Sequence, residues 1–99
     1  MWLQPRQLDA AEIAQMLKRG ADLRANGDVA SARLMYQRAA EAGEAMAALT
    51  LAETYDPLAL PKGGITSDVG LAHFWYEKAK DLGSTVAPER LERLARRPE

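Results

Sequence analysis

The feature of this sequence that most constrains its fold is a segment that occurs twice, forty residues apart. Residues 28–43 read DVASARLMYQRAAEAG and residues 68–83 read DVGLAHFWYEKAKDLG, with six of the sixteen positions identical. Self-similarity at a period of about 20–50 residues is typical of stacked helical repeats. Because such stacks present extended surfaces and seldom build a catalytic pocket, the repeat favours an interaction role.

Length and composition indicate one small all-α domain. The chain has 99 residues, of which 47% are hydrophobic and nineteen are alanine, the best helix former. Val and Ile are sparse, and no alternating strand pattern is present. We expect residues 1–8 to be an irregular lead-in and residues 9–99 to form a single helical-repeat domain. Within this domain, repeat one covers about residues 10–43, repeat two about 44–83, and a capping helix about 84–97.

Capping residues predict the helix boundaries. Asp9 and Glu12 have the spacing of a capping box, and Asp28 and Asp68 each precede a helical apolar pattern. Glycines stand where the first, second and fourth helices end, as expected for a left-handed C-terminal residue. The predicted helices are therefore residues 10–25, 29–42, 44–55, 69–82 and 85–97.

Small residues are predicted to let the helices of each repeat cross closely. In the first repeat, Gly20 and Ala32 would face each other, and Tyr36 would fill the space beside them. The matching residues of the second repeat are Ala52, Ala72 and Tyr76.

The residues at these spacings also carry a family resemblance. The first repeat has Gly20, Leu23, Gly27, Asp28, Ala32 and Tyr36 through Ala39; the second has Leu51 through Tyr55, Asp68, Ala72, Trp75 through Ala79, and Gly83. The first pattern resembles the tetratricopeptide repeat (TPR), and the second is similar to its relative, the Sel1-like repeat. The resemblance covers roughly residues 13–95. It implies a short right-handed α-solenoid of antiparallel helix pairs, about five helices in all, with bacterial scaffolding as one setting.

The sequence departs from this pattern in its last helix. Glu92 stands where the earlier repeats have the small residues Gly20 and Ala52. A large charged residue there suggests that residues 84–97 cap the stack, since terminal repeats carry a polar outer face. A second explanation is that the sequence stops within a longer array.

Charge and composition argue against several classes of partner. The net charge of −1 lacks the basic excess that nucleic-acid binding requires. No apolar run approaches the roughly 20 residues of a membrane span, so we expect no membrane insertion. No signal peptide is recognisable, which slightly favours the cytoplasm, although the compartment stays open. The chain has no cysteine, and we expect no metal site and no cofactor.

No catalytic constellation is recognisable, and we expect a protein that is not an enzyme. His73, the single histidine, has no second ligand or paired base near it in the repeat pattern, and its alignment with Arg33 predicts a surface position. Trp75 and Tyr76 suggest a stacking platform for a sugar or base, but their alignment with Met35 and Tyr36 favours core packing.

The resemblance implies that the first helix of each pair lines a concave face. The partner-binding residues expected on that face are Leu17, Arg24, Met46, Leu49, Glu53, Arg93 and Arg97. Met46 and Leu49 are candidates to seat an apolar anchor of a peptide with charged flanks. The alternative is that they complete a thin core or contact Trp2 and Leu3.

The functional hypothesis is a protein–protein interaction module, acting as an adaptor, scaffold or regulatory domain that binds a protein or peptide segment. The alternative is a structural spacer or self-association unit of a larger protein. In that alternative, the last helix and the Trp2-Leu3 pair would be the contact surfaces, and the chain would form homo-oligomers.

Overall fold

A computed structural model describes residues 8–59 and 67–97. The expectations for the lead-in up to residue 7, including contacts of Trp2 and Leu3, lie outside the described residues. Within the described ranges the regular structure consists of helices α1 (Ala10–Ala25), α2 (Val29–Glu41), α3 (Ala45–Tyr55), α4 (Val69–Asp81) and α5 (Ala87–Ala95), with no strand. The all-α expectation is therefore confirmed.

The helices begin at the capping residues that the sequence indicates. Asp9 accepts a hydrogen bond from the Glu12 amide at 2.8 Å, and the Glu12 carboxylate accepts one from the Asp9 amide at 3.2 Å, which completes a capping box. Asp28 and Asp68 accept from the third residue of their helices at 3.1 and 3.0 Å. Gly27, in the turn that follows α1, has a positive φ angle, which glycine adopts more readily than other residues.

The largest boundary error concerns α5. The predicted helix 85–97 extends only from Ala87 to Ala95. Pro88 occupies the first turn, where its missing N–H costs no helical hydrogen bond. The Ser84 hydroxyl accepts a hydrogen bond from the Ala87 amide at 3.2 Å, so it still supports the start of the helix. The other boundaries differ from the prediction by at most one residue.

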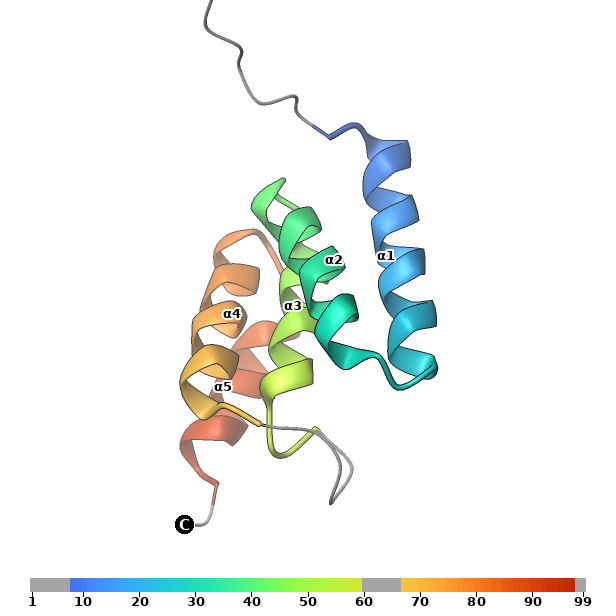
Figure 1. The fold of residues 1–99 in the computed structure, drawn as a ribbon. Coiled ribbons are helices and arrows are strands. Elements are labelled where there is room, and N and C mark those ends of the chain that lie inside the picture. Colours follow the sequence, from blue (N-terminus) through green and yellow to red (C-terminus); the bar gives the residue numbers. More distant parts are fainter. Residues whose placement is uncertain (1–7, 60–66, 98–99) are drawn as a thin grey trace, which may run out of the picture.

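Helices that follow one another along the chain are also neighbours in space. Contacts join α1 to α2, α2 to α3, α3 to α4, and α4 to α5. In Figure 1, α2 and α4 lie in front of α3 and α5, while α1 flanks α2 at one end of the row. The core lies between the two layers, and the faces of α3 and α5 that point away from α2 and α4 form the opposite surface.

Small residues and tyrosines build this core as the repeat predicts. Ala32, Ala72 and Tyr76 are fully buried, and Tyr36 is 3% exposed. A Cβ atom added to Gly20 would lie 2.8 Å from Cε1 of Tyr36, closer than carbon atoms can approach. The glycine therefore allows α1 to pack directly against the Tyr36 ring. At the equivalent position of the second repeat, Ala52 is fully buried in the same core as Tyr76.

The structure also shows which of several candidate site residues are buried and which are exposed. Leu49 is 8% exposed and belongs to the core, so it is not available as a groove residue, whereas Met46 is 56% exposed. Trp75 is buried together with Tyr76, which excludes a stacking platform at this pair. The side chain of His73 is 61% exposed, which confirms its predicted surface position.

Candidate functional site

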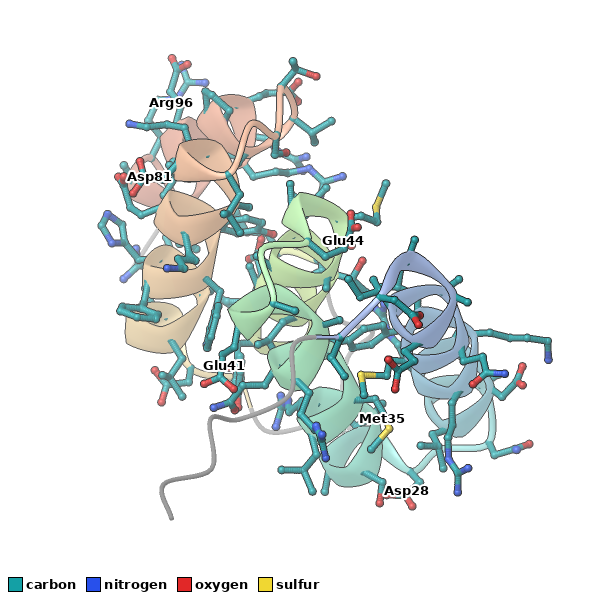
Figure 2. The ribbon with its side chains drawn as sticks, turned by 90° about the horizontal axis from the view of Figure 1, so that it is seen from above. Asp28, Met35, Glu41, Glu44, Asp81 and Arg96 are labelled. Carbon is teal, nitrogen blue, oxygen red and sulfur yellow. The ribbon has the colours of Figure 1, made fainter. Side chains whose placement is uncertain are left out.

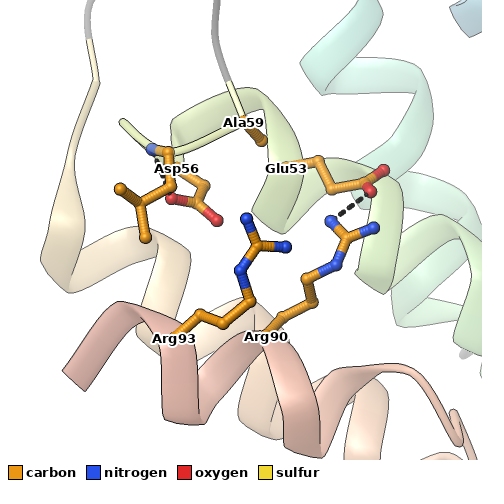
Figure 3. A pocket seen from close by; sticks show the side chains of 6 residues that line it. Glu53, Asp56, Ala59, Arg90 and Arg93 are labelled. Atoms are coloured by element: carbon orange, nitrogen blue, oxygen red, sulfur yellow. Dashed lines mark hydrogen bonds and ion pairs between the residues drawn. The ribbon is translucent and has the colours of Figure 1, made fainter. Parts of the chain in front are cut away.

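A hollow of about 300 Å³ opens where the C-terminal end of α3 meets α5. Glu53 from the last turn of α3, the capping residue Asp56, and the following Leu58 and Ala59 form one wall. Arg90 and Arg93, one turn apart on α5, form the other wall. Figure 3 shows both arginines extending from α5 toward the acidic side chains of the facing wall.

Asp56 is a buried carboxylate whose oxygens are already engaged. It is 3% exposed, accepts a hydrogen bond from the Tyr76 hydroxyl at 2.6 Å, and accepts another from the Leu58 amide at 2.8 Å. The bond to the amide two residues ahead is the local turn that Asp favours, and Pro57 between them prevents the helix from continuing. Burial, together with the bond to Asp56, raises the pKa of Tyr76 above its usual value.

Glu53 and Arg90 form an ion pair across the hollow. The Arg90 Nη1 atom lies 2.7 Å from a Glu53 carboxylate oxygen, and the two side chains are 26% and 23% exposed. The positive charge of Arg90 also acts on the Tyr76 hydroxyl and partly opposes the rise in its pKa. Partial burial makes such a charge-assisted bond stronger than a fully exposed one. This pair therefore fixes α5 against the end of α3.

Arg93 is the charged group of the hollow that remains available. Its guanidinium lies in Figure 3 between Asp56 and Arg90, and no hydrogen bond or ion pair joins it to any described residue. An arginine presents a planar set of five N–H donors that suits carboxylate or carbonyl acceptors. The Arg93 guanidinium is therefore available to a ligand, whereas the other charged side chains that line the hollow already have partners.

The structure brings together part of the predicted groove. Glu53 and Arg93 line the same hollow. Burial raises the pKa of Tyr36, the positive charge of the nearby Arg24 opposes that shift, and the negative charge of Glu53 adds to it. Arg24 and Glu53 therefore approach the same tyrosine from α1 and α3.

The other predicted residues lie apart from the hollow. Leu17 is half-buried and packs on the core, as Leu49 does. Met46 lies in the first turn of α3, away from the hollow, which adjoins that helix's other end. Arg97 follows α5 and donates to the Leu94 carbonyl at 2.8 Å, so it satisfies the end of the helix.

Sequence reasoning missed two residues of this site, Asp56 and Arg90. The available signal for Asp56 was its alignment with Arg24, since both lie four residues after the small crossing residues Ala52 and Gly20. Each of these two positions supplies a polar partner to the tyrosine of its own repeat. Arg90 carried no comparable signal, because it aligns with Lys18 in the first repeat and Thr50 in the second, and neither residue type indicates a pairing with the end of α3.

The described part of the chain gives no indication of metal or membrane chemistry. Residues 8–59 and 67–97 contain no group of three or more His, Cys, Asp or Glu side chains positioned to hold a metal ion. None of the helices in these ranges combines the length and the hydrophobicity needed to cross a bilayer. The groups that line the hollow are hydrogen-bond donors, hydrogen-bond acceptors and small apolar surfaces, a combination suited to binding.

Comparisons with protein-family models, with curated proteins and with solved structures found no match to this chain. The resemblance to tetratricopeptide and Sel1-like repeats therefore stays an expectation drawn from the sequence spacing.

Proposed function

We propose that this chain is a non-catalytic protein–protein interaction module, an adaptor, scaffold or regulatory domain that binds a peptide segment of its partner. In this proposal its helices form a short right-handed solenoid of antiparallel pairs similar to Sel1-like repeats. The segment would bind on the face formed by α3 and α5. The observation that carries the proposal is Arg93, an unpaired guanidinium in a hollow whose other charged side chains are all engaged.

The arrangement of α3 supports an extended ligand. Met46 and Glu53 are separated by two helical turns, which places them on one face of α3 about 10 Å apart along its axis. Met46 is exposed and apolar, and Arg93 adjoins Glu53 across the hollow. A segment of three or four extended residues spans this distance. It would place an apolar side chain on Met46 and a carboxylate or carbonyl group on Arg93.

The surface of α5 supports the capped solenoid in this proposal. Glu92, which aligns with the buried positions Gly20 and Ala52, has a 65% exposed side chain and pairs with Arg96 at 3.5 Å. A further helix packed at this position would have to bury that charge, which is unfavourable. The polar outer face of α5 is therefore consistent with the end of a stack.

Selection from a random peptide display library on the full chain tests the proposal. The selected peptides are then measured against the wild type, Arg93→Gln and Arg96→Gln. Arg96 is the matched control because it directly follows the same helix, has the same charge and is outside the hollow. We expect at least one class of peptide to lose about tenfold in affinity with Arg93→Gln, which corresponds to about 1.4 kcal/mol, and little with Arg96→Gln. Equal losses, or no peptide that depends on Arg93, would contradict the assignment.

Self-association is the second candidate function, and one observation favours it. Leu71 and Phe74, three residues apart on α4, are 39% and 56% exposed, and the Phe74 ring packs edge-on against Trp75 with centroids 5.1 Å apart. Large exposed apolar side chains on one helix face are typical of a protein contact. Sedimentation at several concentrations, with Phe74→Gln as the variant, distinguishes the two functions. A wild-type chain that is monomeric at high micromolar concentration excludes the self-association unit.

A further inference from the structure

A second and larger groove, of about 630 Å³, lies between α1 and α2 and shares no residue with the hollow beside α5. Its walls are six side chains of α1 and two of α2: Glu12, Gln15, Met16, Lys18, Arg19, Asp22, Met35 and Arg38. In volume it falls within the range of about 300–1,000 Å³ that is typical of ligand pockets.

Two methionines supply the apolar part of this groove. Met16 comes from α1 and Met35 from α2, and both are half-buried. Figure 2 shows Met35 on the side of α2 that faces α1. Methionine is unbranched and polarisable, and its side chain adapts to apolar groups of different shapes. The floor of the groove therefore suits a large aliphatic or aromatic side chain.

The charged residues of the groove leave two cations available. Lys18 and Asp22 form an ion pair at 3.0 Å, and the Glu12 carboxylate accepts the Asp9 amide in the capping box. Arg19 and Arg38, by contrast, have no hydrogen-bond or ion-pair partner among residues 8–59 and 67–97. The two arginines come from different helices, so they stand on opposite walls of the groove. The groove therefore combines an apolar floor with two unpaired positive charges.

We propose that this groove is a docking site for an acidic peptide segment with one large apolar side chain. The apolar side chain would contact Met16 and Met35. Carboxylates before and after it would pair with Arg19 and Arg38, each of which can engage a carboxylate through two N–H groups. Charge complementarity selects this occupant, because a basic segment would meet two unpaired arginines and find both acidic groups of the groove already engaged.

Methionine methyl spectra locate such a peptide directly. The chain has four methionines, at positions 1, 16, 35 and 46. With ¹³C-labelled methionine in the full chain, an acidic peptide bound in this groove is expected to shift the Met16 and Met35 methyl signals. The Met46 signal belongs to the face of the proposed function and should not move. Because each site has its own methionine, failure of one proposal is distinguishable from failure of the other.

The probes are random twelve-residue display peptides selected on the wild-type chain. Their binding is measured with the wild type, with Arg19→Gln combined with Arg38→Gln, and with Arg96→Gln as the control. We expect enrichment of peptides with an apolar residue between acidic residues. Loss of the two arginines should weaken their binding about tenfold or more, since each lost charge-assisted contact contributes roughly a threefold to tenfold change. Circular dichroism should be unchanged, because all three arginines are at the surface.

Several outcomes would overturn the proposal. Enrichment of basic or uncharged peptides contradicts it, and so does binding of acidic peptides to the double variant as tightly as to the wild type. Shifts confined to the Met46 methyl would place the acidic peptides on the other face. Broadening of the Met16 and Met35 signals with chain concentration in the absence of peptide would indicate that a second copy of the chain occupies the groove.

Discussion

The hydroxyl of Tyr76 in α4 donates a 2.6 Å hydrogen bond to the buried carboxylate of Asp56 at the end of α3. Tyr76 is one of the two tyrosines that fill the core beside the small crossing residues. The bond therefore joins the packing of the second repeat to the wall of the hollow. If this bond is lost, the Asp56 side chain loses its hydroxyl donor at a position that is only 3% exposed.

Substitution Tyr76→Phe is expected to destabilise the chain by about 1–3 kcal/mol, because it leaves a buried carboxylate without one of its donors. Asp56→Asn should also be destabilising, because the two carboxylate oxygens accept from different donors, the Leu58 amide and the Tyr76 hydroxyl, and a carboxamide supplies only one oxygen. Urea unfolding followed by circular dichroism measures both changes. The matched control is Tyr36→Phe, because Tyr36 fills the equivalent core position but its hydroxyl faces Arg24. Equal losses for the two tyrosines would show that the carboxylate contact contributes nothing specific.

The same contact predicts a loss of stability at alkaline pH. Burial and the bond to Asp56 raise the pKa of Tyr76 above its ordinary value of 10.0, so the folded chain holds this proton more tightly than the unfolded chain. The stabilisation is fully present below about pH 10 and declines as the pH rises toward the folded pKa, by at most about 1.4 kcal/mol per pH unit. Urea midpoints between pH 8 and pH 11 measure this decline. The decline should be shallower in Tyr76→Phe, and parallel curves for the two proteins would contradict the prediction.

The helix ends and the contact between α1 and α2 were easier to predict from the sequence than the hollow beside α5. Capping residues such as Asp28 and the turn residue Gly27 act within a few residues, and they placed the helix ends within two residues of their observed positions. Gly20 and Tyr36 were predictable because the repeat supplies two copies of one packing pattern.

The hollow was less predictable, because its geometry depends on contacts between distant segments. Arg90 and Glu53 are 37 residues apart, and no local spacing links them. Leu49 illustrates the opposite error. It has the spacing of a groove residue on α3, but neighbouring side chains cover it. Which face of an alanine-rich helix stays open depends on the helices that pack beside it, and the periodicity of that helix alone does not contain this information.

Gly20→Ala should destabilise the chain although alanine is the better helix former. The new Cβ would lie within 2.8–2.9 Å of two atoms of the buried Tyr36 ring, so α1 or the ring must move. The overpacking cost of about 1–3 kcal/mol exceeds the gain of about 1 kcal/mol in helix propensity. Thermal or urea unfolding measures the net loss.

A double-mutant cycle identifies the cause of that loss. Tyr36→Leu removes the ring atoms that the new methyl group would meet, so Gly20→Ala should be neutral or stabilising in that background. If Gly20→Ala costs the same with and without the Tyr36 ring, the close approach of α1 to this ring is not the reason for the glycine.

Arg33 is expected to stabilise the contact between α2 and α3 more than a typical surface arginine. Its Nε atom donates to the buried Thr54 hydroxyl at 3.1 Å, its guanidinium also donates to the Thr54 carbonyl, and it stacks on the Tyr55 ring at 3.8 Å from the centroid. A lysine cannot reproduce both the two-point bonding and the stacking. Arg33→Lys should therefore cost about 1–2 kcal/mol in urea unfolding, by loss of a charge-assisted bond and a cation–π contact.

Arg38→Lys is the matched control for this prediction, because Arg38 lies on the same helix, is exposed and has no partner among the described residues. Its substitution should change stability by less than about 0.5 kcal/mol. Thr54→Val tests the contact from the other side, since it removes the hydroxyl that accepts from Arg33 and donates to the Leu51 carbonyl at 2.6 Å. Arg33→Lys should then cost less in the Thr54→Val background than in the wild type. Strictly additive losses would mean that the bond from Arg33 to the Thr54 hydroxyl contributes nothing, and that Arg33 acts through its other contacts, which include the Thr54 carbonyl and the Tyr55 ring.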